Sequence, residues 1–454
     1  MSDLVICVGG SGQHAALAIA RLMHLRALPA GIQCDVIDAD NSSALARSTQ
    51  SLDGYVRPDF GVEHPLGISS YHTPFDARAA ATGGEAGRLP FANLFLGGAA
   101  DTAAIDRNVF EALFTPDDAR TDVLQGFFAR PTIGATAFAA CSEGVATHLR
   151  NKANGVSRVF LIGSFIGGTG AGVIPSLAER VATVNNWHGV FYLNWLNPPA
   201  DAAVSIATMQ NGMRHGLEYF YDEVKPKLRA SALIGPPPNA GVELGAATPG
   251  AHGAESPSVF HIIAARAVHH FNADTTTPYK SDVLAFNVDS DNVGELLDLT
   301  WHGGQTLLKR AQRARRAALL IGYYTGRADG AKEIAKAFSI WGTRGSIPVG
   351  IYDSIDAIKR ATKAKPEVIT DLLIERLHHE AGMLTSTVQW LSTIFSTERL
   401  QRNDPIYDTY ERDSLSTLRT LWDKPFSLPT AGNDPAVLTS NFARYLVNEL
   451  ITHA

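Results

Sequence analysis

Short apolar segments alternate with helical segments over about the first 230 residues, and this alternation restricts the fold more than any other feature of the sequence. Four segments are typical of buried strands: Leu4 to Val8, Cys34 to Asp40, Arg158 to Gly163 and Gly189 to Leu196. Helical segments lie between them, such as Val173 to Val184, with apolar residues spaced by three and four. Such alternation favours a parallel sheet covered by helices on both faces, so we predict an α/β fold.

The pattern changes along the chain and predicts three regions. Residues 1–255 hold the alternating segments and end in a Pro/Gly/Ala-rich stretch at 236–257. Residues 256–330 begin with an apolar core helix, Ser258 to Phe271, and continue through a polar loop into a long helix. Residues 331–454 read as a mainly helical C-terminal domain, interrupted by one strand-like run, Ser346 to Tyr352.

Charge and composition narrow the classes of function. The 454-residue chain has a net charge of −6, so bulk electrostatics favour neither nucleic acid nor an anionic membrane. No apolar run reaches the roughly 18 residues of a membrane span, and no signal-peptide core follows the start, which predicts a cytoplasmic protein. We interpret the three cysteines, Cys7, Cys34 and Cys141, as buried small hydrophobes rather than a redox pair.

A glycine-rich stretch, SFIGGTGAG, joins a predicted strand to a predicted helix at Ser164 to Gly172. A strand, a glycine loop and a helix in this order direct backbone N–H groups and a helix N-terminus toward an anion. The alternative is a strand-to-helix turn that binds nothing. The stretch lacks the lysine of a Walker A motif, so backbone amides, a helix dipole and a metal ion would neutralise phosphate charge.

A second glycine loop follows the first predicted strand, with Gly9, Gly10, Ser11 and Gly12. Together with the following residues it fits the GxGxxA fingerprint of dinucleotide-binding domains, and Asp38 or Asp40 supplies the expected acidic residue. An NAD- or FAD-dependent oxidoreductase is therefore one hypothesis.

Two glycine loops on one sheet favour a different ligand, because a dinucleotide fold uses a single fingerprint loop. Two loops can hold a triphosphate from two sides. Asp40, with Asp38 two residues earlier, is then placed to hold Mg²⁺ directly or through water. Ordinary solvation of the strand end is the alternative for this acidic pair.

The motifs resemble those of the tubulin/FtsZ superfamily, in its divergent bacterial branch. The stretch GGTGAG is similar to the GGGTG[ST]G phosphate signature, with Ile166 in place of its first glycine; its residues are Gly167, Gly168, Thr169, Gly170, Ala171 and Gly172. The first loop resembles the first FtsZ nucleotide loop, with Gln13 and His14 near its asparagine. The run Val36 to Leu45 resembles the second FtsZ loop, INTDxxAL, and Asp40 falls on its aspartate.

Further along, the resemblance implies a ribose-side loop at Asn194 to Pro199, including Asn197, and a base-reading role for Asn211. A polar residue on an exposed helix face is the equal alternative for Asn211. The run Ala285 to Leu296 resembles the catalytic NxDxxD loop, which would make Asn287, Asp289 and Asp291 the catalytic residues.

The resemblance implies a GTP-binding protein that uses Mg²⁺ and assembles head-to-tail into filaments. The acidic loop of one subunit would then complete the GTPase site of its neighbour. A nucleotide-gated scaffold with little hydrolysis is the second reading, and the dinucleotide oxidoreductase is the third. The basic run KRAQRARR, with Lys309, Arg313 and Arg316 on one helix face, suggests a protein partner at the C-terminal helices. A solvated helix face is the expected explanation of such a run, and no nucleic-acid partner is expected.

Overall fold

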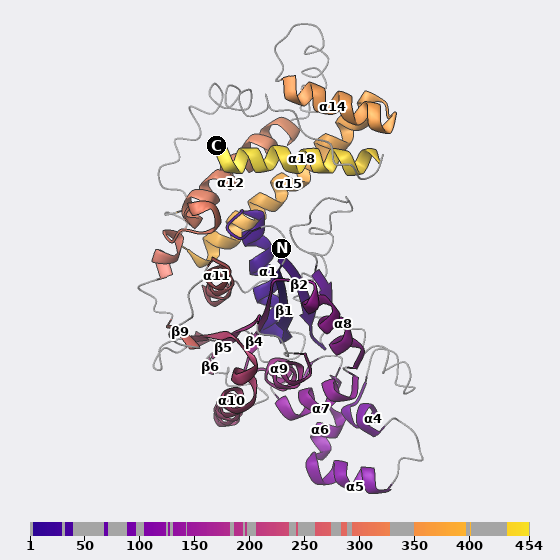
Figure 1. Cartoon of the computed structure of the whole chain (residues 1–454), viewed down its shortest axis with the longest axis vertical. Coiled ribbons are helices and arrows are strands. Elements are labelled where there is room, and N and C mark those ends of the chain that lie inside the picture. Colours follow the sequence, from indigo (N-terminus) through magenta and orange to yellow (C-terminus); the bar gives the residue numbers. More distant parts are fainter. Residues whose placement is uncertain are drawn as a thin grey trace. The chain divides into compact units, whose positions relative to one another are not determined.

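The structure is a computed structural model of the chain (Figure 1). It describes residues 3–29, 32–39, 68–70, 89–96, 104–123, 126–127, 130–141, 143–181, 186–193, 196–197, 206–235, 242–243, 259–273, 283–287, 293–326, 349–395, 400 and 434–453. Contacts group the chain into two compact units. The first ends at Val293, and the second contains Arg21–Leu28 and the chain from Gly294 onward. The three-part division at residues 255 and 330 stays a prediction.

A parallel sheet forms the centre of the first unit, as predicted. Its strands within the described residues are β3 (Ile68–Ser70), β2 (Ile32–Ile37), β1 (Asp3–Val8), β4 (Arg158–Ser164), β5 (Trp187–Tyr192), β7 (Ala230–Gly235) and β9 (Val283–Asn287), in that spatial order. Every neighbouring pair is parallel. A separate short pair joins β6 (Leu196–Asn197) to β8 (Val242–Glu243).

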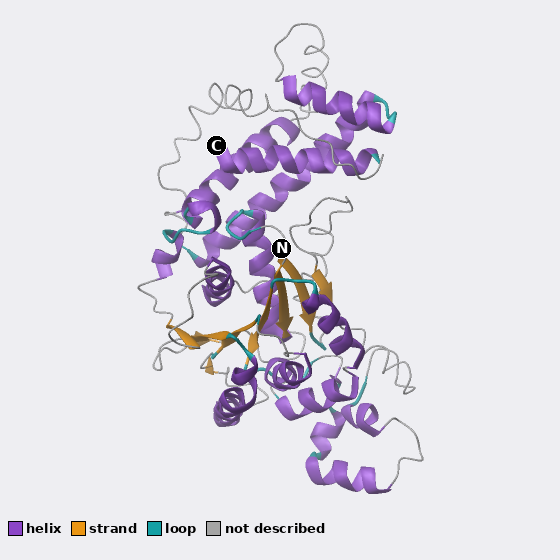
Figure 2. Ribbon diagram, in the orientation of Figure 1, coloured by secondary structure: helices purple, strands orange, loops and turns teal. Residues whose placement is uncertain are grey.

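Helices cover the sheet on both faces, which confirms the predicted fold class (Figure 2). They are α1 (Gly9–His24), α8 (Glu143–Asn154), α9 (Gly168–Val181), α10 (Ile206–Tyr219) and α11 (Val259–Ala273). Alternate side chains of each strand serve opposite faces. In β4, Val159 and Leu161 join the core beneath α9, whereas the ring of Phe160 lies 6.5 Å from that of Phe271 on α11. Near-continuous apolar strands are what a sheet buried on both faces requires.

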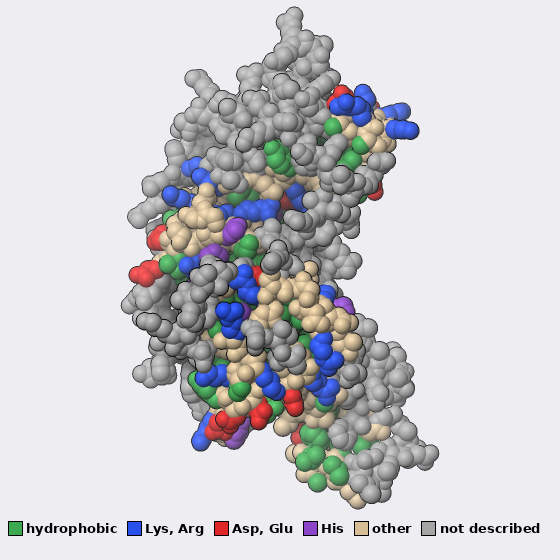
Figure 3. Space-filling model, viewed as in Figure 1, with side chains coloured by type: hydrophobic (Ala, Val, Ile, Leu, Met, Phe, Trp, Pro, Cys, Tyr) green, Lys and Arg blue, Asp and Glu red, His purple; other side chains and the backbone are tan. Residues whose placement is uncertain are grey.

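A group of short helices precedes β4 in the chain: α4 (Phe91–Leu96), α5 (Ala104–Leu113), α6 (Pro116–Arg120) and α7 (Pro131–Cys141). A small core that includes Phe91, Phe110 and Phe127 holds them together. Val109 and Leu113 of α5 remain exposed, and Figure 3 shows hydrophobic side chains gathered over α5 and α6. Only one stripe of α5 therefore packs against the rest of this group.

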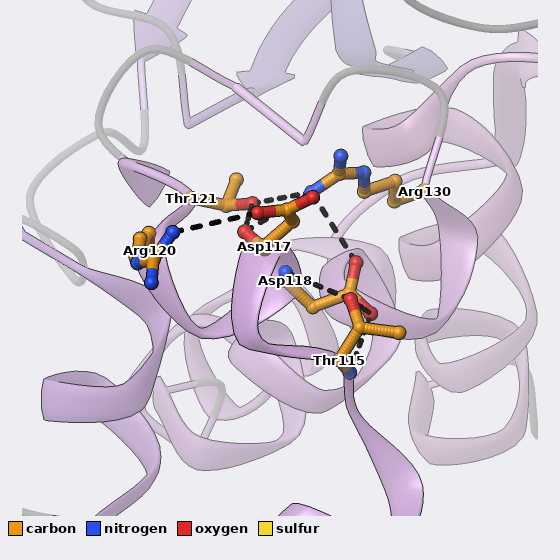
Figure 4. Close-up of polar contacts among 6 residues, drawn as sticks. All are labelled: Thr115, Asp117, Asp118, Arg120, Thr121 and Arg130. Atoms are coloured by element: carbon orange, nitrogen blue, oxygen red, sulfur yellow. Dashed lines mark hydrogen bonds and ion pairs between the residues drawn. The ribbon is translucent and has the colours of Figure 1, made fainter.

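Arg130 connects α6 to the start of α7 (Figure 4). Thr115 caps α6 by accepting from the N–H of Asp118 at 3.2 Å, and the Asp118 carboxylate accepts from the N–H of Thr115 in return. Arg130 then contacts Asp118 at 3.2 Å and donates to the hydroxyl of Thr121 at 2.7 Å. Because Arg130 directly precedes α7, these bonds fix where α7 begins, and α7 in turn packs against α9.

The second unit is helical in its described residues: α12 (Leu307–Gly326), α14 (Val349–Thr362), α15 (Pro366–Ile394) and α18 (Pro435–His453). The predicted strand at Ser346 to Tyr352 is wrong from Val349 onward, because these residues begin α14. The β-propensity of this short run is outweighed by its place in a longer helix, because β-propensity depends strongly on context. The predicted long helix corresponds to α12, and the chain turns before it at Gly303 and Gly304, both with positive φ.

The basic run of α12 makes local contacts. Arg310 is buried and donates to the carbonyls of Leu25 and His302, both within the second unit. Burial and the neighbouring charges of Arg313 and Arg26 lower the pKa of Arg310 to about 10. Arg313 donates to Gln305 at 2.9 Å. These contacts tie α12 to the turn before it, and a protein partner at this helix stays a prediction.

Candidate functional site

The two glycine loops lie side by side at the carboxyl edge of the sheet. The first follows β1 and the second follows β4, and these strands are neighbours in the sheet. The chain leaves β1 toward β2 on one side, whereas β4 leads to β5 on the other. This reversal creates the crevice in which ligands of open α/β sheets bind. The prediction that both loops belong to one sheet is confirmed by this arrangement.

The contact between the loops is direct. Gly9 has a φ of +71°, and a side-chain carbon placed on it would lie 3.0 Å from the backbone nitrogen of Gly170. The same carbon would lie 3.2 Å from Cβ of Thr169. Both the left-handed backbone and the close approach exclude any residue but glycine at position 9 without strain. The N-termini of α1 and α9 therefore converge.

Most other glycines of the loops are explained by close packing of backbone on backbone. A Cβ on Gly12 would lie 2.7 Å from the carbonyl carbon of Cys7, and one on Gly168 would lie 2.7 Å from Cβ of Phe127. Gly170 meets the carbonyl of Ser164, and Gly172 meets α7 at Pro131 and Ala135. Gly167 differs, because nothing among the described residues would lie within 4 Å of its Cβ. It is the only glycine of the second loop that borders space free of described atoms.

Asp38 joins the two loops from the end of β2. Its Oδ2 accepts from Nε2 of Gln13 on α1 at 2.5 Å, and its Oδ1 accepts from the hydroxyl of Thr169 on α9 at 3.1 Å. The backbone N–H of Ala39 donates to Oδ1 at 2.8 Å. Asp38, Gln13 and Thr169 are 3%, 1% and 8% exposed. The carboxylate is thus surrounded by protein donors and turned inward.

Aromatic rings lie beside the first loop. The imidazole of His14 stacks on that of His261 on α11, with centroids 4.7 Å apart and planes 14° apart. The ring of Tyr192, at the end of β5, meets His261 edge-on at 5.8 Å. The Tyr192 hydroxyl is buried without a hydrogen-bond partner among the described residues, and burial raises the pKa of Tyr192 well above its usual range. Burial, followed by the neighbouring His14, lowers the pKa of His261.

Cys7 and Cys34 lie behind the first loop in neighbouring strands. Both are fully buried, with sulfurs 3.6 Å apart. The hydrogen bond with Cys7 and the burial of the thiol raise the pKa of Cys34 well above its usual range. The full burial of both thiols fits the interpretation of these two residues as core hydrophobes. The side chain of Cys141 lies outside the described residues.

The remaining predicted residues are placed as follows. Gly10 and Ser11 are half-buried in the first turn of α1, and Ala171 is buried in α9. Asn197 belongs to β6, outside the main sheet, and Asn211 is exposed on α10. Asn287 is the last residue of β9, so the proposed catalytic loop begins at a strand of the main sheet rather than directly after α11. Asp40, Asp289 and Asp291 lie outside the described residues.

The described residues hold no cluster of protein ligands that would bind a metal ion without a nucleotide. Among them, no group of three or more His, Cys, Asp or Glu residues is placed to hold a metal ion. Protein donors bind both oxygens of the Asp38 carboxylate, and its predicted ligand role stays a prediction. Mg²⁺ coordination by Asp40 stays a prediction.

Several residues at this edge were not predicted from the sequence. Phe127, Gly134 and Pro131 press on the second glycine loop from α7 and the segment before it, and Tyr192 and His261 flank the first. The contact of Gly134 with the carbonyl of Gly168 has one sequence signal, a glycine inside a helical segment. The other four are residues that no local motif distinguishes.

Comparisons with known proteins add little to this geometry. No protein-family model matches the sequence, and no curated protein matches it. Among solved structures, the chain is similar to CetZ2 from Haloferax volcanii in a GTPγS-bound protofilament, with 15% identity and a TM-score of 0.33. The likeness covers 65% of this chain and 63% of that chain. A likeness at this TM-score supports no conclusion about function. None of the helices in the described part of the chain is long and apolar enough to cross a bilayer.

Proposed function

We propose that this chain is a tubulin/FtsZ-like GTP-binding protein whose phosphate site lies between the two glycine loops. One observation carries the proposal: the loops after β1 and β4 touch at Gly9 and Gly170, and one buried carboxylate, Asp38, binds both. Motifs far apart in the sequence therefore form a single structure. This is the arrangement that the resemblance to the superfamily implies.

Two convergent helix N-termini favour a polyanion. The first backbone bond of α9 runs from Ala171 to Gly167 at 3.0 Å, so the N–H groups of Gly168, Thr169 and Gly170 precede the helical ladder. The first turn of α1 adds a second set of such donors. Each helix terminus carries a partial positive charge of about half an elementary charge, and both act on the same space. The open space at Gly167 leaves room for a phosphate group.

The orientation of Asp38 argues against a dinucleotide. The strand order of the sheet is shared with dinucleotide-binding folds, so topology does not separate the two hypotheses. In a dinucleotide site, however, the acidic residue at the end of the second strand accepts from the ribose hydroxyls. Asp38 is 3% exposed and bound by Gln13 and Thr169 instead. A ribose hydroxyl would have to displace one of these donors.

We further propose that hydrolysis requires a neighbouring subunit. Asn287 ends β9, four strands away from β1, which is about 19 Å at the usual strand spacing. The acidic loop that starts there begins far from the glycine loops of its own chain. Asp289 or Asp291 would therefore orient water at the γ-phosphate of the next subunit, in a head-to-tail filament. A scaffold that binds nucleotide but hydrolyses little is the alternative.

Calorimetric titration of the nucleotide-stripped protein with GTP, ATP and NAD tests the proposed binding of GTP. We expect GTP to bind with micromolar or tighter affinity and NAD not to bind. Gly167→Asp, which adds a negative charge in open space, should abolish triphosphate binding, whereas the uncharged Gly167→Asn should retain most of it. NAD binding without triphosphate binding, or equal behaviour of the two variants, would contradict the proposal.

Measurements of GTP turnover and of assembly test the proposed hydrolysis by a neighbouring subunit. Light scattering after GTP addition should report filaments, and phosphate release should rise more than linearly with protein concentration. Asp289→Ala and Asp291→Ala should bind GTP normally but lose turnover. Normal binding and assembly of the wild type without phosphate release would favour the scaffold instead.

A further inference from the structure

Asp38 is a buried carboxylate that accepts hydrogen bonds from described residues in three separate places of the chain. Gln13 reaches it from the second turn of α1, Thr169 from the first turn of α9, and Ala39 from directly after Asp38 in the chain. Each carboxylate oxygen therefore has a protein donor. A carboxylate that accepts such bonds is stable when buried, whereas its removal would leave the donors without an acceptor.

The position of Asp38 relates the two loops to each other. Gln13 follows directly after the glycines of the first loop, and Thr169 lies between Gly168 and Gly170 of the second. Backbone contact at Gly9 and Gly170 sets how closely the loops approach, but a glycine contact has no side chain to prevent sliding. The directional bonds from Gln13 and Thr169 to Asp38 restrain the sliding of one loop along the other.

We propose that Asp38 is a positioning residue that fixes the spacing of the two phosphate loops and does not itself contact the nucleotide or its metal. The proposal rests on the proposed GTP site, and it replaces the ligand role that the sequence suggested for Asp38. The loops must present their N–H groups to one triphosphate at the same time, so a small displacement of one loop against the other weakens binding. Asp38 prevents that displacement.

Conservative and disruptive variants separate positioning from direct contact. Asp38→Asn keeps an oxygen for Thr169 and Ala39, and the Gln13 amide can rotate to accept from the new NH₂ group. Asp38→Ala removes the acceptor of the bonds from Gln13, Thr169 and Ala39. We expect Asp38→Ala to weaken GTP binding at least tenfold and Asp38→Asn to stay within threefold of the wild type. A direct metal ligand would show equal losses in both variants, and that result would overturn the proposal.

Asp35 provides the matched control. It lies on β2, is fully buried, and bonds to Lys152 at 2.6 Å on the side of α8, away from the loops. Asp35→Ala and Asp38→Ala should both lower the melting temperature, but Asp35→Ala should leave GTP affinity within threefold of the wild type. If Asp35→Ala weakens binding as much as Asp38→Ala, or if Asp38→Ala binds normally, Asp38 does not position the loops.

We call the link that Asp38 forms between the two loops, through Gln13 and Thr169, the clamp. A double-mutant cycle tests this clamp without any ligand. Asp38→Ala and Thr169→Val each remove one partner of the same hydrogen bond, so the double variant should melt higher than the sum of the two single losses predicts. Additive losses would refute the clamp whatever the protein binds. Coupled losses in a protein that binds no GTP would refute the proposed function and leave the clamp intact.

Discussion

Gly172→Ala tests whether the glycines of the second loop are required by packing rather than by a ligand. A methyl group on Gly172 would lie 2.6 Å from the nitrogen of Ala135 and 3.0 Å from the carbonyl carbon of Gly134, and it would also meet the Pro131 carbonyl. All three contacts are backbone atoms in the first turns of α7. Relief therefore requires a shift of the helix rather than the rotation of a side chain.

The expected loss combines two opposing effects. Overpacking costs about 1–3 kcal/mol, and contact with a rigid backbone places this site near the upper end. Replacing glycine by alanine inside a helix returns about 1 kcal/mol. The net loss is about 2 kcal/mol, which lowers the melting temperature by about 4–8 °C in a unit of this size.

Gly212→Ala is the control, because Gly212 lies inside α10 of the same unit and no described atom would lie within 4 Å of its Cβ. We expect this variant to melt about 2 °C higher than the wild type, from helix propensity alone. Circular dichroism at 222 nm during heating measures both variants. If Gly172→Ala is as stable as Gly212→Ala, the packing account of this glycine is wrong.

Three further predictions concern stability. Burial opposes the ionisation of Glu380, but the hydrogen bond and charge of His24, with other nearby cations, lower its pKa to about 2. The resulting stability is complete above about pH 4.5 and lost as the pH falls toward 2, and Glu380→Gln should flatten that part of a pH–unfolding curve. Burial lowers the pKa of His188 to about 4, so the free energy of unfolding should fall as the pH drops from 6.5 to 4. His188→Phe should remove this fall. NMR should show the wild-type imidazole neutral at pH 6. Thr115→Ala should cost about 1 kcal/mol in urea unfolding by removing the cap of α6, whereas Arg120→Ala, whose ion pair is exposed, should leave the midpoint unchanged.

The strands β1, β2, β4 and β5 could be predicted because each of them carries its own signal in the sequence. Leu4 to Val8 and Arg158 to Gly163 are apolar without interruption, as strands buried on both faces are. The strands β7 and β9 were not predicted. Val283–Asn287 has only five residues, and Ala230–Gly235 lies directly beside the proline-rich stretch. Only pairing with β5 and with each other identifies them as strands.

The roles of individual residues at the site depended on tertiary contacts. The sequence indicated that both glycine loops follow strands and precede helices, and that an acidic residue ends the second strand. It could not indicate that Asp38 turns inward, because the donors that hold it come from Gln13 and Thr169 in distant segments. Nor could it show that Gly172 accommodates α7, since a glycine needed for packing looks the same as one needed for a ligand.

The sequence by itself determined the α/β class, the two loops and their connection to helices, because periodicity and glycine preference are local properties of the chain. The tertiary structure decided which loops meet, which glycines serve packing and which carboxylate is enclosed. These depend on distances between residues far apart in the sequence, and such distances exist only after the strands have paired and the helices have packed against them.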